Sequence, residues 1–245
     1  MKLRIKFAKS GCMKFIGHLD IMRYFQKAIR RAGIDIAYSE GFSPHQIMSF
    51  AAPLGVGLES EGEYLDIQVH SASSSRQMAK ALNQAMTEGM KVRSVRRLPE
   101  DGKNAMSIVA AADYFVRFYG DCSQEFDAFM ARKEISVVKK TKKNEVMLDI
   151  RPLIYDFRRE ESGIFLKLAT GSVNNLKPEL VMETFFSWIG KEWDPFCCQV
   201  CRLDLYAWAD GRKPEEDAVS EESGAVLADC FISLEELGEV IGGVE

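Results

Sequence analysis

The sequence carries the same order of predicted secondary-structure elements twice, and this repeat constrains the fold more than any other feature. From Leu3, apolar and charged residues alternate strictly, which predicts a strand with one buried face. The next segment has apolar residues on one side of a helical wheel and basic residues on the other, and Gly33 ends it. The first set comprises four strands and two helices. The strands start at Leu3 and lie near 47–51, at 63–69 and at 90–98, and the helices lie at 17–32 and 75–86.

The second half repeats the order after a linker of small residues at 100–112. Two units of the β-α-β-β-α-β type in tandem are typical of a ferredoxin-like pair. We therefore expect an α+β protein with antiparallel sheets, divided into units at 1–99 and 113–209. The second set comprises strands at 114–120, 164–170 and 199–208, a hairpin turning at residues 142–144, and helices at 123–133 and 178–190.

Charge is distributed unevenly along the chain. The net charge is −4, but residues 1–112 carry +6 and residues 113–245 carry −10. Residues 210–245 alone account for −9, so we expect an acidic tail outside the two units. Ser233 and Glu236 form a capping-box pattern, which predicts a short amphipathic helix at 233–241. This helix either folds back on the body, which we favour, or docks on a partner.

Several protein classes do not fit the composition. No apolar run approaches the roughly 20 residues of a membrane-spanning helix, and the charged start does not resemble a secretion signal. The six cysteines fit reduced thiols, so we expect a cytoplasmic protein with no membrane association. The cluster at 197–201 lacks a second cysteine pair and the CxxxCxxC spacing of a radical-SAM cluster. We therefore expect no metal and no cofactor.

A basic face is the most informative functional feature. In a ferredoxin-like sheet the first and fourth strands are neighbours, so their cations gather on the face opposite the helices. Such a face with an aromatic side chain suits single-stranded RNA. Alternatively, the second unit covers this face and the charges line the groove between the units. The candidate contacts are Lys2, Arg4, Lys6, Tyr64, Lys91, Arg93 and Arg97, with Arg23, Arg30 and Arg31 on the outer side of the first helix.

Catalytic candidates are few. His18 and Asp20 begin the first predicted helix and could meet His45 of the GFSPH loop. As a general acid–base pair, two histidines would suit RNA cleavage. The alternative for His18 is a partly buried side chain with no catalytic role.

Residues 15–67 contain a long pattern that resembles the radical-SAM-linked proteins, a bacterial family of unknown function. Gly17 departs from it, because the family usually has serine there, and residues 171–181 resemble the segment before the family's last helix. The matching residues include His18-Leu19-Asp20, Arg23, Arg30-Arg31, Tyr38-Ser39, Gly41-Phe42, Pro44-His45 and Glu63-Tyr64-Leu65-Asp66.

The resemblance implies a partner. Members of that family are fused to, or encoded beside, a radical-SAM protein, often near genes for an RNase E/G-type ribonuclease. No catalytic residue is established for the family, so none is transferred. We expect an RNA-binding accessory protein of a separately encoded radical-SAM protein. The alternatives are a metal-independent endoribonuclease using His18 and His45, and a protein-interaction module for the radical-SAM partner.

Overall fold

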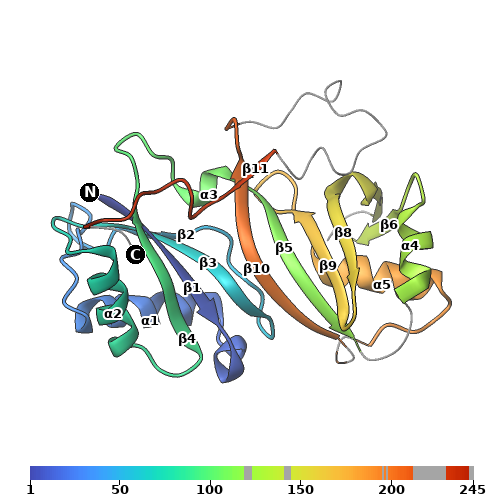
Figure 1. Ribbon diagram of the computed structural model, residues 1–245, viewed down its shortest axis with the longest axis horizontal. Coiled ribbons are helices and arrows are strands. Elements are labelled where there is room, and N and C mark those ends of the chain that lie inside the picture. Colours follow the sequence, from blue (N-terminus) through green and yellow to red (C-terminus); the bar gives the residue numbers. More distant parts are fainter. Residues whose placement is uncertain (119–122, 141–144, 195, 197, 212–229, 243–245) are drawn as a thin grey trace.

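One mixed sheet runs through both halves of the molecule in the computed structural model (Figure 1). The structure describes residues 1–118, 123–140, 145–194, 196, 198–211 and 230–242. The strands follow the order β4-β1-β3-β10-β5-β9-β8, and β2 pairs with β3 while β11 pairs with β10. The contact between β10 and β3 is parallel and all other pairs of named strands are antiparallel. The protein is therefore an α+β protein with a mostly antiparallel sheet.

The elements follow the chain in this order: β1 (Lys2–Lys9), η1 (Gly11–Phe15), α1 (His18–Arg31), β2 (Met48–Phe50), β3 (Glu59–Gln68), α2 (Ser75–Ala85), β4 (Met90–Arg97), α3 (Ala105–Ile108), β5 (Val109–Phe118), α4 (Ser123–Met130), β6 (Ser136–Lys140), β7 (Glu145–Asp149), η2 (Arg151–Leu153), β8 (Ile154–Glu160), β9 (Gly163–Ala169), α5 (Pro178–Trp188), β10 (Cys198–Trp208) and β11 (Phe231–Ser233). None of the described helices is long and apolar enough to cross a membrane.

The first half follows the predicted periodicities closely, but the expected linker at 100–112 and the expected helix at 233–241 were wrong, and one strand of the second half was not predicted. Part of the expected linker at 100–112 is strand, because β5 begins at Val109. An unpredicted strand, β8, joins the main sheet, while β6 and β7 form a separate two-stranded sheet. Residues 233–241 contain no helix: the chain continues from β11 as turns and extended chain. The expected turn at 142–144 and most of the acidic tail lie outside the described residues.

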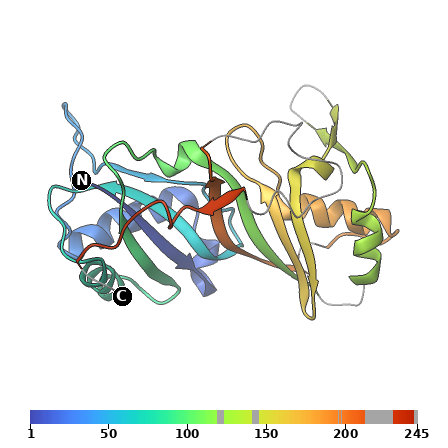
Figure 2. The ribbon, with the colours of Figure 1, turned by 45° about the horizontal axis from the view of Figure 1, so that its top comes forward.

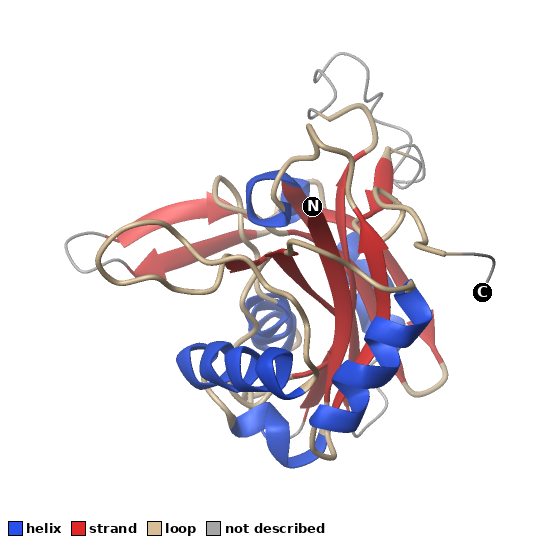
Figure 3. Ribbon diagram, turned by 90° about the vertical axis from the view of Figure 1, so that its left-hand side faces the viewer, coloured by secondary structure: helices blue, strands red, loops and turns tan. Residues whose placement is uncertain are grey.

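Each half has its own hydrophobic core. In the first, α1 and α2 pack against β1, β3 and β4, with Phe7 and Phe25 at the centre and ring centroids 4.6 Å apart. In the second, Phe126 of α4 and Phe185 of α5 lie with ring centroids 5.0 Å apart. Burying one such ring contributes about 1.5–3 kcal/mol. Figure 3 views the molecule from the first half and shows the helices packed against the strands.

The two halves meet along a short seam. Strands β3 and β10 are in register only at Glu59–Ser60 and Cys201–Arg202. At Gly62 a side-chain Cβ would collide with the Leu203 carbonyl oxygen, so the close approach of these strands requires glycine. Because the backbone pairing is so short, side-chain contacts across the seam carry much of the connection.

Candidate functional site

The acidic and aromatic residues of β3 that belong to the family-like pattern lie in buried contacts. Asp66 accepts two hydrogen bonds from Arg4, at 2.8 and 2.9 Å, and a third from the Ala105 backbone N–H at 2.7 Å. The Tyr64 hydroxyl donates to Asp204 Oδ1 at 2.5 Å, and burial raises its pKa far above the usual range. The side chains of Arg4, Tyr64 and Asp66 are all buried. These residues therefore hold the fold together and do not form an open binding surface.

A second buried pair lies across the seam. Arg202 is 2 % exposed, and its Nε donates to Glu63 Oε1 at 2.7 Å. Its guanidinium also donates to the Ala52 carbonyl oxygen. Burial lowers the pKa of Arg202, but Glu63 and Tyr114 together outweigh that effect and the pKa is raised, so the arginine stays charged.

The segment 231–242, which we call the C-terminal strap, covers the expected basic face. From β11 the strap runs across the first half toward α2, where the Ile241 carbonyl oxygen accepts from the Ser75 backbone N–H (Figure 2). Its Glu235 binds Lys6 and Arg96, each at 3.2 Å. Burial lowers the pKa of Lys6, but Asp204 and Glu235 outweigh that effect, so the pKa is raised. The strap thus neutralises the centre of the face.

The candidate contacts on that face are therefore mostly engaged within the protein. Arg4 is 1 % exposed and donates to the Leu234 carbonyl oxygen of the strap. Arg93 pairs with Glu61, and Arg97 pairs with Glu239 at 3.0 Å. The predicted sheet order placed these cations on one face correctly. The centre of that face is not open as expected, because the C-terminal strap covers it, and the sheet order gives no information on the strap. Lys2 donates to the Gly102 carbonyl oxygen at 3.0 Å, and Lys91 is exposed at the margin.

The outer side of α1 is the basic surface that remains open. Its side chains Arg23, Lys27, Arg30 and Arg31 are all exposed, and Asp20 is the only acidic residue of the helix. Arg23 lies 3.3 Å from Asp20 in an exposed ion pair, and Arg31 donates to the Ala85 carbonyl oxygen at the end of α2 at 2.8 Å. Exposed ion pairs contribute about 0–1 kcal/mol, so Arg23 can exchange its partner at little cost.

A protruding loop lies beside this helix. Residues 38–46, which we call the aromatic loop, stand out from the body in Figure 2. A backbone bridge joins Tyr38 to Gln46, whose side chain donates to the Gln26 carbonyl oxygen of α1 at 3.3 Å. At the tip the Phe42 side chain is fully exposed, with a relative exposure of 112 %, and Tyr38 is 47 % exposed. The loop therefore presents aromatic side chains beside the basic helix.

The catalytic candidates do not share neighbours. The His18 ring packs edge-on against Phe50, with centroids 5.3 Å apart. His45 Nδ1 lies 2.8 Å from the Ser39 hydroxyl in the aromatic loop, which contacts α1 at Gln26. Eight residues of helix separate Gln26 from His18, or about 12 Å along the axis. Asp20 contacts Arg23 and no histidine among its described contacts, so the structure does not assemble the expected acid–base group.

The described cysteines form no metal site. Burial, with the carboxylates of Glu61 and Glu59 nearby, raises the pKa of Cys201 to about 11, so its thiol stays protonated at neutral pH. Cys12 is exposed and distant in sequence, while Cys122 and Cys197 lie outside the described residues. Within the described part of the chain, no three His, Cys, Asp or Glu side chains are placed to hold a metal ion.

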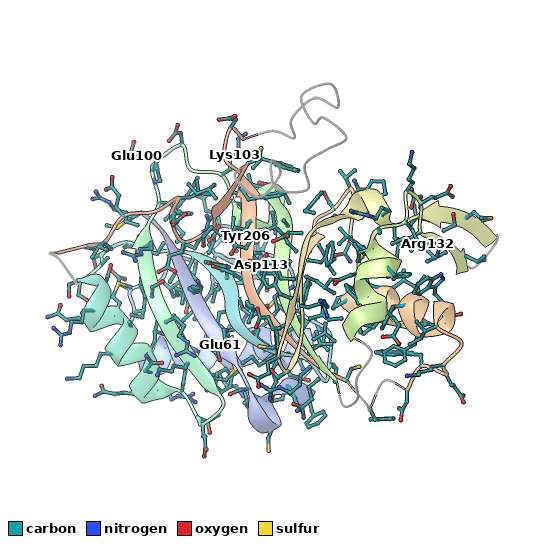
Figure 4. The ribbon with its side chains drawn as sticks, turned by 45° about the vertical axis from the view of Figure 1, so that its right-hand side comes forward. Glu61, Glu100, Lys103, Asp113, Arg132 and Tyr206 are labelled. Carbon is teal, nitrogen blue, oxygen red and sulfur yellow. The ribbon has the colours of Figure 1, made fainter. Side chains whose placement is uncertain are left out.

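A buried polar cluster in the second half was not expected. Tyr206 of β10 donates to Asp113 Oδ2 of β5 at 2.8 Å (Figure 4). The Lys167 ammonium lies 2.7 Å from Asp113 Oδ1 and 3.5 Å from the Tyr206 ring centroid. Burial raises the pKa of Asp113 despite the adjacent Lys167. The sequence did contain a signal for this cluster, because Asp113 and Lys167 are ionisable residues within apolar strand patterns. The same signal was present for Arg202 and Asp204.

Comparison with known proteins places the chain in a family. The profile of a family described as an uncharacterised protein conserved in bacteria, DUF2344, matches residues 2–178. That span includes the aromatic loop, α1 and the buried residues of β3. No curated protein matches the sequence. Because the match covers well over half of the chain, the protein belongs to the bacterial DUF2344 family.

Proposed function

We propose that this protein is an RNA-binding accessory protein whose RNA-contacting surface is the outer side of α1 together with the aromatic loop. The observation that carries the proposal is the juxtaposition of exposed cations and a fully exposed Phe42 on two elements that contact each other through Gln26 and Gln46. Single-stranded nucleic acids bind to such surfaces because cations attract the phosphates and aromatic rings stack on the bases.

The charge on this side of the first half supports the proposal. Helix α2 packs beside α1 and adds exposed Arg76 and Lys80, with no acidic residue of its own. The overall charge of the chain is negative, but much of the acidic charge lies in residues 210–245. A local basic surface attracts phosphates over about one Debye length, roughly 8–10 Å at physiological salt, so the local balance matters more than the total.

Hydrogen bonds within the aromatic loop hold its two ends together. The Ser39 backbone N–H donates to the His45 carbonyl oxygen at 2.8 Å, and the His45 backbone N–H donates to the Ser39 hydroxyl at 3.1 Å. Gly41 adopts φ = 110°, which the turn requires and other residues rarely adopt. Ordering the loop in advance lowers the entropy cost of binding, so Phe42 can stack on a base with little rearrangement.

The test compares RNA affinity as a function of salt. The Arg23→Gln/Lys27→Gln/Arg30→Gln variant should reduce the slope of log K against log salt by about 2, since each single-strand phosphate contact contributes about 0.7. The matched control, which removes the same charge from the second half, is Arg132→Gln/Lys133→Gln/Lys177→Gln, and it should leave the slope unchanged. Equal losses in the two variants would contradict the assignment of the surface.

The aromatic contribution is tested separately. Phe42→Ala should weaken binding of a single-stranded oligonucleotide by about 1–3 kcal/mol, the usual contribution of one stacked base. Phe196→Ala is the control, since Phe196 is also 93 % exposed but lies in the second half. If both substitutions had the same effect, stacking by the aromatic loop would be refuted.

The proposed protein partner is a separately encoded radical-SAM protein, and the support for it is the sequence resemblance of residues 15–67. Co-purification of the two proteins with and without RNA tests this proposal. An endoribonuclease that uses His18 and His45 receives no support from the geometry, because the two side chains have different neighbours. RNA that stays intact with the wild-type protein would exclude that activity.

We also propose that the two halves are tandem ferredoxin-like units. The order β4-β1-β3-β2 in the first half and β10-β5-β9-β8 in the second both correspond to the 4-1-3-2 arrangement. A crystal structure with a different strand order in either half would contradict this proposal.

A further inference from the structure

A small cavity lies beneath the start of α1, away from the outer face of that helix. It has a volume of about 20 Å³ and is open to the surface. Its apolar lining includes Phe50 and Leu54, and its polar lining consists of Lys9, His18 and Glu63. A space of this size holds about one water molecule or a group of one or two heavy atoms. An amine, an imidazole and a carboxylate thus share one small apolar cavity.

Lys9 is unusual among the lysines of the first half. It is the last residue of β1 and is only 4 % exposed. Among the described residues, its ammonium has no hydrogen bond and no ion pair within 4.0 Å, whereas Lys6 of the same strand has two carboxylate partners. An ammonium on a largely buried side chain loses much of its hydration, and without a partner its pKa falls.

The charged groups around Lys9 reinforce this state. Burial lowers the pKa of Lys9, Glu63 on β3 opposes the shift, and Arg202 on β10 adds to it. Glu63 is already bound to the guanidinium of Arg202, so its negative charge is largely neutralised. His18 of α1 is exposed at the same cavity. A lysine in these surroundings has more of the neutral, nucleophilic form at neutral pH than an exposed lysine has.

We propose that Lys9 is a nucleophilic amine that forms a Schiff base with a one-carbon aldehyde, formaldehyde, admitted past His18. The neutral Lys9 Nζ attacks the carbonyl carbon, and one proton passes from the nitrogen to the carbonyl oxygen to give a neutral carbinolamine. The hydroxyl of the carbinolamine is then protonated and leaves as water while the nitrogen lone pair forms the C=N bond, and the resulting iminium loses its proton to give the imine. His18 at the opening carries these protons. No oxidant or reductant takes part, and the volume of the cavity restricts the substrate to a one-carbon aldehyde.

The experiment traps the imine on the intact protein. Wild-type protein is incubated with formaldehyde and sodium cyanoborohydride at pH 7, and the methyl adduct at each lysine is measured over time by peptide mass spectrometry. We expect the Lys9 adduct to form at least tenfold faster than the adduct of exposed Lys27. Lys6, which is held by Asp204 and Glu235, is the matched control on the same strand and should react slowest.

A second variant separates chemistry from packing. His18→Gln should slow labelling of Lys9 several-fold at pH 7 and leave labelling of Lys27 unchanged. The variant should have the circular dichroism spectrum of the wild type, which shows that it is folded. RNA affinity should not change in this variant, so the result is independent of the proposed RNA surface. Equal labelling rates for Lys9 and Lys27, or a wild-type rate at Lys9 in His18→Gln, would overturn the proposal.

Discussion

Removal of the Asp66 carboxylate should destabilise the protein strongly, because it leaves the Arg4 guanidinium buried without its partner. Arg4 is 1 % exposed and makes two hydrogen bonds to Asp66, and the Ala105 backbone N–H also depends on this carboxylate. Breaking a buried pair from one side costs about 3–5 kcal/mol. Total stabilities of about 5–15 kcal/mol are usual, so Asp66→Ala should remain folded but lose a large fraction of its stability.

Urea unfolding followed by circular dichroism at pH 7 measures this loss. With a slope of about 3 kcal/mol/M, the unfolding midpoint of Asp66→Ala should fall by roughly 1–2 M. Asp20→Ala is the matched control, because Asp20 also pairs with an arginine, Arg23, but both side chains are more than half exposed. That control should shift the free energy of unfolding by less than about 1 kcal/mol.

A double substitution tests the cause of the loss. Arg4→Met combined with Asp66→Ala removes the stranded charge and should recover part of the stability lost in Asp66→Ala alone. A loss below about 1 kcal/mol in Asp66→Ala, or one equal to that of Asp20→Ala, would refute the conclusion that this residue is structural.

Three further predictions concern the strap and the cysteines. The pKa of Glu235 is lowered because Ser94, Lys6 and Arg96 together outweigh burial. The stabilising contribution of Glu235 is therefore present above about pH 4.5 and disappears as the pH falls through the lowered pKa. Glu235→Gln should flatten the dependence of the urea midpoint on pH in that acidic range. Leu234 is completely buried, so Leu234→Ala should cost about 2–5 kcal/mol in the same urea assay, and a cost near zero would mean that the strap is not docked in solution. Iodoacetamide at pH 8 should alkylate exposed Cys12 well before Cys201, whose thiol is protonated, as peptide mass spectrometry would show.

Local patterns predicted the first half well because its elements bury one face each. The helix expected at 17–32 is α1, and its basic side chains face outward as the helical wheel indicates. The pattern failed at 109–112, where alanines resemble a linker but form β5, since pairing with β9 and β10 determines their conformation. It failed again at Ser233 and Glu236, where strand pairing and burial of Leu234 override the local helix signal.

The candidate site shows what alternation can and cannot predict. Alternation along β1 placed Arg4 and Lys6 on one face correctly, but only the tertiary structure shows that Glu235, more than 200 residues away in the chain, occupies that face. The outer cations of α1 were predictable because helical periodicity alone places them on the exposed side of the helix, without any contact to another segment. The neighbourhood of Lys9, His18 and Glu63 depends on how β1, α1 and β3 pack together, so no local pattern indicates it.

The salt dependence of single-stranded RNA binding is the most direct test of the proposed RNA-binding surface on α1 and the aromatic loop. Fluorescence anisotropy with a labelled oligonucleotide, measured between about 50 and 200 mM salt, gives the number of phosphate contacts from the slope. We predict a clear slope that falls by about 2 in Arg23→Gln/Lys27→Gln/Arg30→Gln and stays unchanged in the second-half control. Binding that shows no salt dependence, or a slope identical in the two variants, would contradict the account.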